Sequence, residues 1–350
     1  MVKAVGVDPG SYTFDIFGIE DGKPYLDLSI STEEVNRNPE VLLNVLVRSK
    51  ADFIIGPSGY GLPLKRIDEI DEKDSILLTL PSKKKSPIGL RKVLEFLKKG
   101  KLNLYFSPSV KHLTTVPEHR KINRIDLGTA DKLCSSILAC YEHTKFFNIG
   151  YEEASFIMVE MGYSFNALIG IDKGEIVDGI GGTLTHLGFS SLGCLDGELA
   201  CLIENFDKSL IFQGGVRYIK ESLKPEDFNE SHGIVWEAFM EGIEKDLAQL
   251  LVSVKEPKEI ILVGRLARVE SIYDELKKRL SKYSKVRKLE GLAKVAKEAA
   301  QGAALLADGL ANGQFKSLID AMKIKEAKGS ILDYLYIKEA KEIRKRLGLE

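Results

Sequence analysis

Short apolar runs alternate with polar turns in the first thirty residues of the chain. The run that ends at Val7 leads into the acidic turn Asp8-Pro9-Gly10-Ser11, and two further apolar segments are joined at Asp21-Gly22. An Asp-Gly step supplies the positive φ that a tight hairpin needs, so the pattern predicts a three-stranded antiparallel meander. A helix over 31–49 and strands over 51–56 and 102–106 are expected to follow.

The same pattern returns in the second half of the chain. The stretch 159–174 repeats the stretch 7–22 without a gap, at a constant offset of 152 residues. The matched positions include the acid, the glycine after it and the hairpin glycine, which pair as Asp8 with Glu160, Gly10 with Gly162, and Gly22 with Gly174. Two meanders can resemble each other by chance, but an acid, a glycine and a hairpin kept at one spacing favour duplication.

The periodicity after the second meander predicts a second domain of similar organisation. It indicates a glycine-rich loop over 178–197 and a strand over 259–263 that runs into Gly264-Arg265. Helices are expected over 199–206, 231–254, 269–281 and 292–313. We therefore expect an N-terminal domain over 1–148 and a C-terminal domain over 149–325. The charged stretch 326–350 predicts an amphipathic helix that packs back on the first domain or meets a partner.

Length and charge narrow the functional class. The 350 residues suffice for two domains, and the net charge of −1 gives no field that would attract nucleic acid or an anionic membrane. No apolar stretch approaches the roughly 20 residues of a membrane span, and the N-terminus lacks a signal-peptide core. The four cysteines form no C-x-x-C pair, which indicates reduced thiols. The expectation is a cytoplasmic protein without nucleic-acid or membrane partners.

The duplicated acidic turn is the first candidate for chemistry. A carboxylate stands at the tip of each strand, as Asp8 and as Glu160, and a glycine follows it. Glycine lets backbone N–H groups approach an anion closely, while the carboxylate can hold Mg²⁺ through water. Either turn alone could be an ordinary tight turn. Two such turns facing each other would clamp a polyphosphate.

Two further segments could contribute to the same site. Asp131 lies in the first turn of a long helix, where it could cap the helix or act as a general base toward a substrate hydroxyl. Gly264 follows a buried strand and could admit an adenine or ribose face, or it could be a plain strand-to-helix turn. Arg217 is a further candidate for contact with an anion.

The order of these segments resembles the superfamily of sugar kinases, acetate kinases, Hsp70 and actin, over about residues 2–315. More narrowly, the chain is similar to an uncharacterised archaeal family labelled predicted butyrate kinase. The resemblance implies an α/β fold of duplicated ribonuclease-H-like (actin-like ATPase) domains, with mixed five-stranded sheets flanked by helices and a cleft between the domains. It assigns 8–11 and 160–163 to phosphate binding and 263–266 to adenosine.

The resemblance also implies a function. It points to an ATP- and Mg²⁺-dependent kinase of a small acceptor, such as the short-chain carboxylate butyrate, and it allows a homodimer. The alternative is an actin-like regulatory ATP-binding protein or ATPase. The run 128–132 is similar to that of type III pantothenate kinases, in which the aspartate is the base, so Asp131 becomes the first catalytic candidate.

A glycine-rich loop of the second half lies where acetate and butyrate kinases present groups to the substrate. Its histidine, His186, could hold phosphoryl charge during transfer or make only local hydrogen bonds. The catalytic candidates are Asp131, Asp8 and His186. The candidates for metal binding are Asp8 and Glu160. The candidates for nucleotide binding are Asp8, Gly10, Ser11, Glu160, Gly162, Tyr163, Gly181, Gly182, Thr183, Gly264 and Arg265.

Two positions depart from the superfamily pattern. Glu160 stands where aspartate is usual, and Arg265 stands where a second glycine is usual. The guanidinium of Arg265 could stack on adenine or block the usual nucleotide position.

Overall fold

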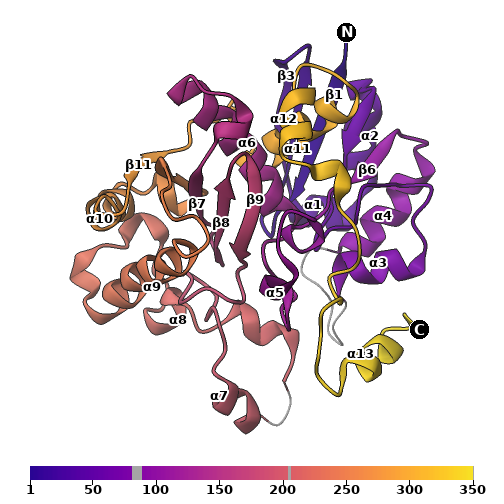
Figure 1. The fold of residues 1–350 in the computed structure, drawn as a ribbon. Coiled ribbons are helices and arrows are strands. Elements are labelled where there is room, and N and C mark those ends of the chain that lie inside the picture. Colours follow the sequence, from indigo (N-terminus) through magenta and orange to yellow (C-terminus); the bar gives the residue numbers. More distant parts are fainter. Residues whose placement is uncertain (81–88, 204–205, 350) are drawn as a thin grey trace.

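The chain folds into two lobes, each built on one mixed β-sheet with helices on its faces (Figure 1). The structure is a computed structural model that describes residues 1–80, 89–203 and 206–349. The first sheet has the order β3-β2-β1-β4-β6-β5 and the second has the order β11-β10-β7-β8-β9. The strands are β1 (Lys3–Pro9), β2 (Thr13–Glu20), β3 (Lys23–Ser31), β4 (Phe53–Ile55), β5 (Lys65–Arg66), β6 (Leu104–Phe106), β7 (Phe156–Met161), β8 (Asn166–Asp172), β9 (Glu175–Ile180), β10 (Glu259–Val263) and β11 (Lys285–Lys288).

Both sheets contain the same five-stranded unit, which confirms the predicted fold class. An antiparallel meander is extended by two parallel strands, β4 and β6 in the first lobe and β10 and β11 in the second. The first sheet departs from the expected five strands, because the two-residue strand β5 adds an antiparallel edge. Strand β11 was not expected, since its sequence KVRK offers a single apolar residue.

The duplication seen in the sequence is kept in the backbone. Asp8 pairs with Asp15 across β1 and β2, and Glu160 pairs with Ala167 across β7 and β8, at the same offset. Both second hairpins carry positive φ at two adjacent residues, Asp21-Gly22 and Lys173-Gly174. Matching hydrogen bonds close the two acidic turns, from the amide of Gly10 to the carbonyl of Thr13 and from Gly162 to Phe165, each 2.9 Å long.

Three helices differ from the sequence-based expectation. The segment 31–49 forms two helices, because Pro39 lacks an amide hydrogen and disfavours helix at Asn38. The helix expected over 292–313 begins only at Glu298. The helix expected over 326–350 covers seven residues, Ala340–Arg346, because the backbone before it takes positive φ at Gly329 and Tyr334.

The α-helices have the following bounds: α1 (Thr32–Arg37), α2 (Glu40–Ser49), α3 (Glu72–Thr79), α4 (Leu90–Lys99), α5 (Glu118–Lys121), α6 (Ala130–Phe147), α7 (Gly197–Leu202), α8 (Val216–Ile219), α9 (Ile234–Leu250), α10 (Glu270–Leu280), α11 (Glu298–Leu310), α12 (Lys316–Ala321) and α13 (Ala340–Arg346). None of the helices within the described ranges has both the length and the apolar character that a membrane crossing requires.

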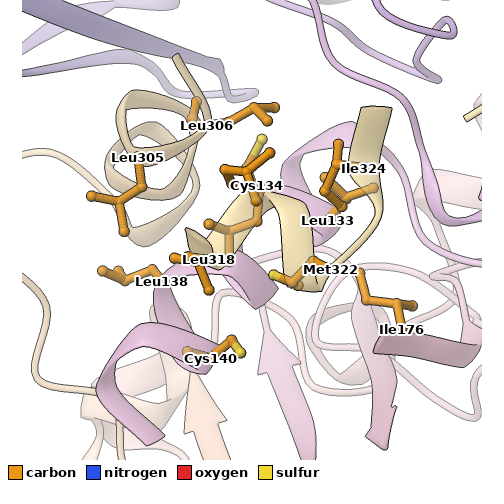
Figure 2. Packing of buried hydrophobic residues seen from close by; sticks show 14 of the residues in the cluster. Leu133, Cys134, Leu138, Cys140, Ile176, Leu305, Leu306, Leu318, Met322 and Ile324 are labelled. Carbon is orange, nitrogen blue, oxygen red and sulfur yellow. The ribbon is translucent and has the colours of Figure 1, made fainter. Parts of the chain in front are cut away.

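Helices α6 and α11 are exchanged between the lobes. Helix α11 comes from the second half of the chain but packs on β1 of the first sheet, while α6 comes from the first half and packs on β7 and β8. Glycines allow α11 to approach both β1 and α6 closely. A Cβ at Gly6 of β1 would lie 2.3 Å from the carbonyl oxygen of Ala300 in α11, and one at Gly302 of α11 would lie 1.7 Å from that of Cys134 in α6. Figure 2 shows the apolar contacts that follow, with side chains of α6, α11 and α12 in one buried cluster.

Candidate functional site

The two acidic turns, one from each lobe, meet through a pair of tyrosine rings. The ring of Tyr12, from the first turn, meets the ring of Tyr163, from the second, edge to face with 5.3 Å between centroids. The amides of Gly10 and Gly162 are used inside their turns. The next amides along the chain donate to no partner within the described ranges, namely those of Ser11, Tyr12, Tyr163 and Ser164. Two sets of free amides therefore lie on turns that meet through these rings, and free backbone amides of this kind are typical of anion sites.

Asp8 lies at the end of β1 and is almost fully buried. Burial raises the pKa of its carboxyl to about 7; the ammonium of Lys297 opposes this shift, and the negative charges of Asp131 and Asp15 add to it. Its strand neighbour in register, Asp15, is also buried. The paired strands β1 and β2 thus hold two buried carboxylates beside the first turn, and both need positive charge nearby.

Lys297 supplies that charge from a distant part of the sequence. Its Nζ lies 2.7 Å from Oδ2 of Asp15 and 2.8 Å from Oγ1 of Thr13. Burial works against the ammonium, but Asp8 and Asp15 hold the pKa of Lys297 above its ordinary value. A Cβ at Gly10 would lie 2.7 Å from this Nζ, so the glycine leaves room for the lysine.

A second lysine joins Asp131 to Glu160. Nζ of Lys132 lies 2.8 Å from Oδ2 of Asp131 and 2.5 Å from Oε1 of Glu160, while Thr129 donates to the other oxygen of Asp131. Burial disfavours the ammonium, yet the two carboxylates raise the pKa of Lys132 well above its usual range. Burial also acts on Asp131, but Lys132 and Thr129 outweigh it and lower the pKa of that carboxyl.

Of the carboxylates of Asp131 and Glu160, that of Glu160 has fewer hydrogen-bond and ion-pair partners. Burial raises its pKa, and Lys132 offsets only part of the shift. Its second oxygen, Oε2, is buried and makes no hydrogen bond in the described part of the chain, although the hydroxyl of Ser135 is near enough to Glu160 to lower its pKa. Leaving a buried carboxylate oxygen unpaired is costly, so this atom is poised to accept a donor or a cation.

Two guanidinium groups lie on the second-lobe side of the gap. Arg217 donates to the hydroxyl of Tyr163 at 2.8 Å, and Arg265 lies 5.2 Å from the centroid of the same ring. Arg265 also pairs with the exposed Glu226. Gly264 has φ +91 and touches the second turn, because a Cβ there would lie 2.6 Å from the carbonyl oxygen of Met161. The segment expected to bind adenosine therefore adjoins the second turn.

The glycine-rich loop meets this region through Asp126. The amide and hydroxyl of Thr183 donate to Oδ2 of Asp126 at 3.4 and 3.5 Å. A Cβ at Gly181 would lie 1.9 Å from Oδ1 of Asp126, and one at Gly182 would meet the side chain of Phe165. Packing alone thus requires glycine at both positions. Their role toward a ligand remains a prediction.

His186 lies in a different environment. Its Nδ1 is 2.7 Å from Oδ1 of Asp246, a fully buried residue of α9, and its backbone amide donates to the other oxygen. Burial raises the pKa of Asp246, and the histidine opposes that shift. Within the described ranges, no hydrogen bond or ion pair joins His186 to Asp8, Asp131 or Glu160. Asp8 and Asp131 lie close enough for the charge of one to affect the pKa of the other, whereas His186 pairs with Asp246 instead.

The carboxylates suit a magnesium ion that is also held by phosphate. Among the described residues, no group of three or more His, Cys, Asp or Glu side chains is arranged for a metal ion. Mg²⁺ in phosphotransferases is usually held by one or two carboxylates together with phosphate oxygens and water. Asp8 and Glu160 fit that arrangement, and the unpartnered Oε2 of Glu160 is the observation that supports it.

Several site residues were not foreseen from the sequence. Lys297 lies 284 residues from its partner Thr13 and precedes an ordinary alanine-rich helix, so no local signal marks it. Asp15 carries a weak signal, since it is an acid inside an apolar strand whose repeat partner is Ala167. Lys132 could have been found as the neighbour of Asp131, but nothing in the sequence pairs it with Glu160.

Three solved structures with a similar two-lobed fold are a propionate kinase and two acetate kinases. A propionate kinase from Francisella tularensis subsp. tularensis SCHU S4 superposes with a TM-score of 0.62 at 13% identity, over 87% of this chain and 98% of its own. Acetate kinase from Entamoeba histolytica gives a TM-score of 0.57 at 14% identity, over 80% and 86%. Acetate kinase from Porphyromonas gingivalis gives 0.55 at 12%, over 87% and 98%. At such low identity these likenesses establish the fold.

Sequence comparison identifies the family. A search of curated proteins found no match. Residues 6–337 match the model of the family described as "Protein of unknown function (DUF1464)", which spans both lobes and every candidate residue of the site. The chain therefore belongs to the DUF1464 family.

Proposed function

We propose that this protein is an ATP-dependent phosphotransferase that acts on a small acceptor, a short-chain carboxylate such as butyrate. The observation that carries the proposal is the meeting of the two duplicated turns at Tyr12 and Tyr163. Each turn offers free amides, a buried carboxylate and a nearby ammonium. The kinase folds that superpose on the chain are consistent with a nucleotide in this place.

The residues divide into three roles under this proposal. The amides of Ser11, Tyr12, Tyr163 and Ser164 bind phosphate oxygens, and Gly264 and Arg265 border the adenosine. Asp8 and Glu160 would hold Mg²⁺, which when bound neutralises charge on the phosphates. Arg217, which has no carboxylate partner within the described ranges, is placed to stabilise the charge of the phosphoryl group in transfer.

The state of Asp131 favours a carboxylate acceptor. Both of its oxygens are already engaged, by Thr129 and by Lys132, and its pKa is lowered. A carboxylate acceptor needs no base: its oxygen attacks the γ-phosphorus, the bond to the β–γ bridging oxygen breaks, and ADP leaves with an acyl phosphate formed. Asp131 then acts as a positioning residue that fixes Lys132 between the lobes.

The test combines binding with turnover. Thermal shift with ATP, with and without Mg²⁺, should show stabilisation, and ADP release should rise with acetate, propionate or butyrate but not with sugars or pantothenate. Absence of any ATP effect would refute the proposal. ADP release stimulated only by a sugar or pantothenate would retain a kinase but reject the carboxylate acceptor.

A regulatory ATP-binding protein is the second candidate, favoured by one contact between the lobes. Nζ of Lys208, in a segment of the second lobe that follows α7, donates to the carbonyls of Thr79 and Leu80 at the end of α3 in the first lobe. Nucleotide-dependent movement of the lobes would make or break this contact. Basal ATP hydrolysis that no acceptor stimulates would support this second function.

A further inference from the structure

We propose that Lys297 is a phosphate-binding residue of the nucleotide site, and that its ammonium adds a charged donor to the free amides of Ser11 and Tyr12. The inference rests on the proposed function, because it concerns the same nucleotide site. It adds a binding residue that the sequence did not indicate.

The first argument is the donor count at Lys297. An ammonium has three N–H donors. Two of them are accounted for by Thr13 and Asp15, and among the described residues the ammonium makes no third hydrogen bond, although the nearby carboxylate of Asp8 helps to raise its pKa. The nitrogen occupies the place that a side chain at Gly10 would fill. It therefore lies beside the residue that precedes the free amides of Ser11 and Tyr12, where an added phosphate oxygen would find a charged donor.

The second argument is that the lysine is held in place by its own loop. Asp27, on β3, accepts hydrogen bonds from the backbone amides of residues 294, 295 and 296 at 2.7–3.1 Å. On the other side of Lys297, Glu298 pairs with Arg268, which follows Gly264 by four residues. Both neighbours of the lysine are thus anchored to the walls of the site. A donor fixed before binding loses little conformational freedom when the ligand arrives.

The third argument is the local charge. Four carboxylates, those of Asp8, Asp15, Asp131 and Glu160, share the two ammonium groups of Lys132 and Lys297. A polyphosphate that approaches these carboxylates needs positive charge where it makes contact. Lys297 lies beside Gly10, next to the free amides of the first turn, so its removal should weaken binding of the anion.

Isothermal titration of the full chain tests the proposal in three arms: ATP in EDTA, ATP with Mg²⁺, and Mg²⁺ alone. Lys297→Met should weaken ATP binding by about 10- to 100-fold in each arm in which the wild type binds ATP, the range expected for one charge-assisted hydrogen bond. Because the variant loses a positive charge beside two carboxylates, it should bind Mg²⁺ alone at least as well as the wild type does. Lys297→Arg should retain most of the affinity.

Lys255→Met provides the matched control, because Lys255 is exposed before the start of β10, at the end of that strand remote from Gly264. It removes one positive charge and should leave all three arms unchanged. If Lys297→Met binds ATP as the wild type does, the inference is overturned while the proposed function stands. If ATP binds in no arm, the proposed function itself fails. Should Lys297→Met not fold, Lys297→Gln, which keeps a donor for Thr13, takes its place in the same three arms.

Discussion

At the scale of single residues, Asp8 links the site to pH. An unfolded aspartate titrates near 3.8, whereas the folded carboxyl of Asp8 titrates near 7. Between these values the folded protein retains a proton that the unfolded chain has released. The contribution of Asp8 to the free energy of unfolding therefore falls as the pH rises from about 4 to about 7 and stays low above that.

Asp8→Asn should remove this part of the pH dependence. Without added nucleotide, we expect the variant to gain thermal stability relative to the wild type as the pH rises from 5 to 8. Melting temperatures across that range provide the measurement. Asp274→Asn, at an exposed position of α10, should follow the wild-type profile. Parallel curves for Asp8→Asn and wild type would show that Asp8 is not held protonated.

The effect of replacing Asp131 distinguishes a carboxylate acceptor from a hydroxyl acceptor. If the acceptor is a carboxylate, Asp131→Asn should lower kcat by about tenfold or less, because no proton has to be removed. With a hydroxyl acceptor, loss of a general base would cost about 10²- to 10⁴-fold. Steady-state kinetics with the acceptor found in the ADP-release panel decides between them. A loss above a thousandfold with a carboxylate would give Asp131 a direct part in the transfer.

At the scale of elements, the contact between the β10 turn and the end of β7 depends on Gly264. Its φ is positive, and an added Cβ would lie only 2.6 Å from the carbonyl oxygen of Met161, so the turn leaves no room for a side chain. Gly264→Ala should lower the free energy of unfolding by roughly 2 kcal/mol or more. Chemical denaturation measures this loss.

Gly197 provides the control position for the replacement of Gly264. It begins α7 without positive φ, and a Cβ there would meet nothing within 4 Å. Gly197→Ala should be neutral or slightly stabilising, since alanine restricts the unfolded chain. Equal losses at both positions would show that the close approach at Gly264 does not limit stability.

The elements also show what could be predicted from the sequence. The meanders, the strand that ends at Val263 and the long helix after Asp126 depend on local apolar spacing and turn residues, so they were found. Strand β11 has one apolar residue, and the segment 290–296 is held by the side chains of Glu142 and Asp27. Neither structure could therefore be predicted from the local sequence. Lys297 acquires its partners, and Lys132 its contact with Glu160, only when distant segments meet, so neither arrangement could be assigned from spacing.

At the scale of the whole molecule, the boundary we propose between residues 148 and 149 separates two complete sheets. It does not separate two complete cores. The first sheet packs against α11 at the glycine-to-backbone contact of Gly6 with Ala300, and α6 packs on the second sheet. Each half of the chain thus lacks the helix that covers its own inner face and carries the helix that covers the other.

The exchange of α6 and α11 makes the two halves obligate complements. Fragments 1–148 and 149–350 expressed separately should aggregate or remain unfolded, whereas co-expressed fragments should purify together and bind ATP as the intact chain does. Cooperative unfolding of either fragment alone would contradict this. A duplicated ancestor that still folded as a single copy would have lost that independence once the helices were traded. The pairing of copies, rather than either copy, would then be the unit on which selection acts.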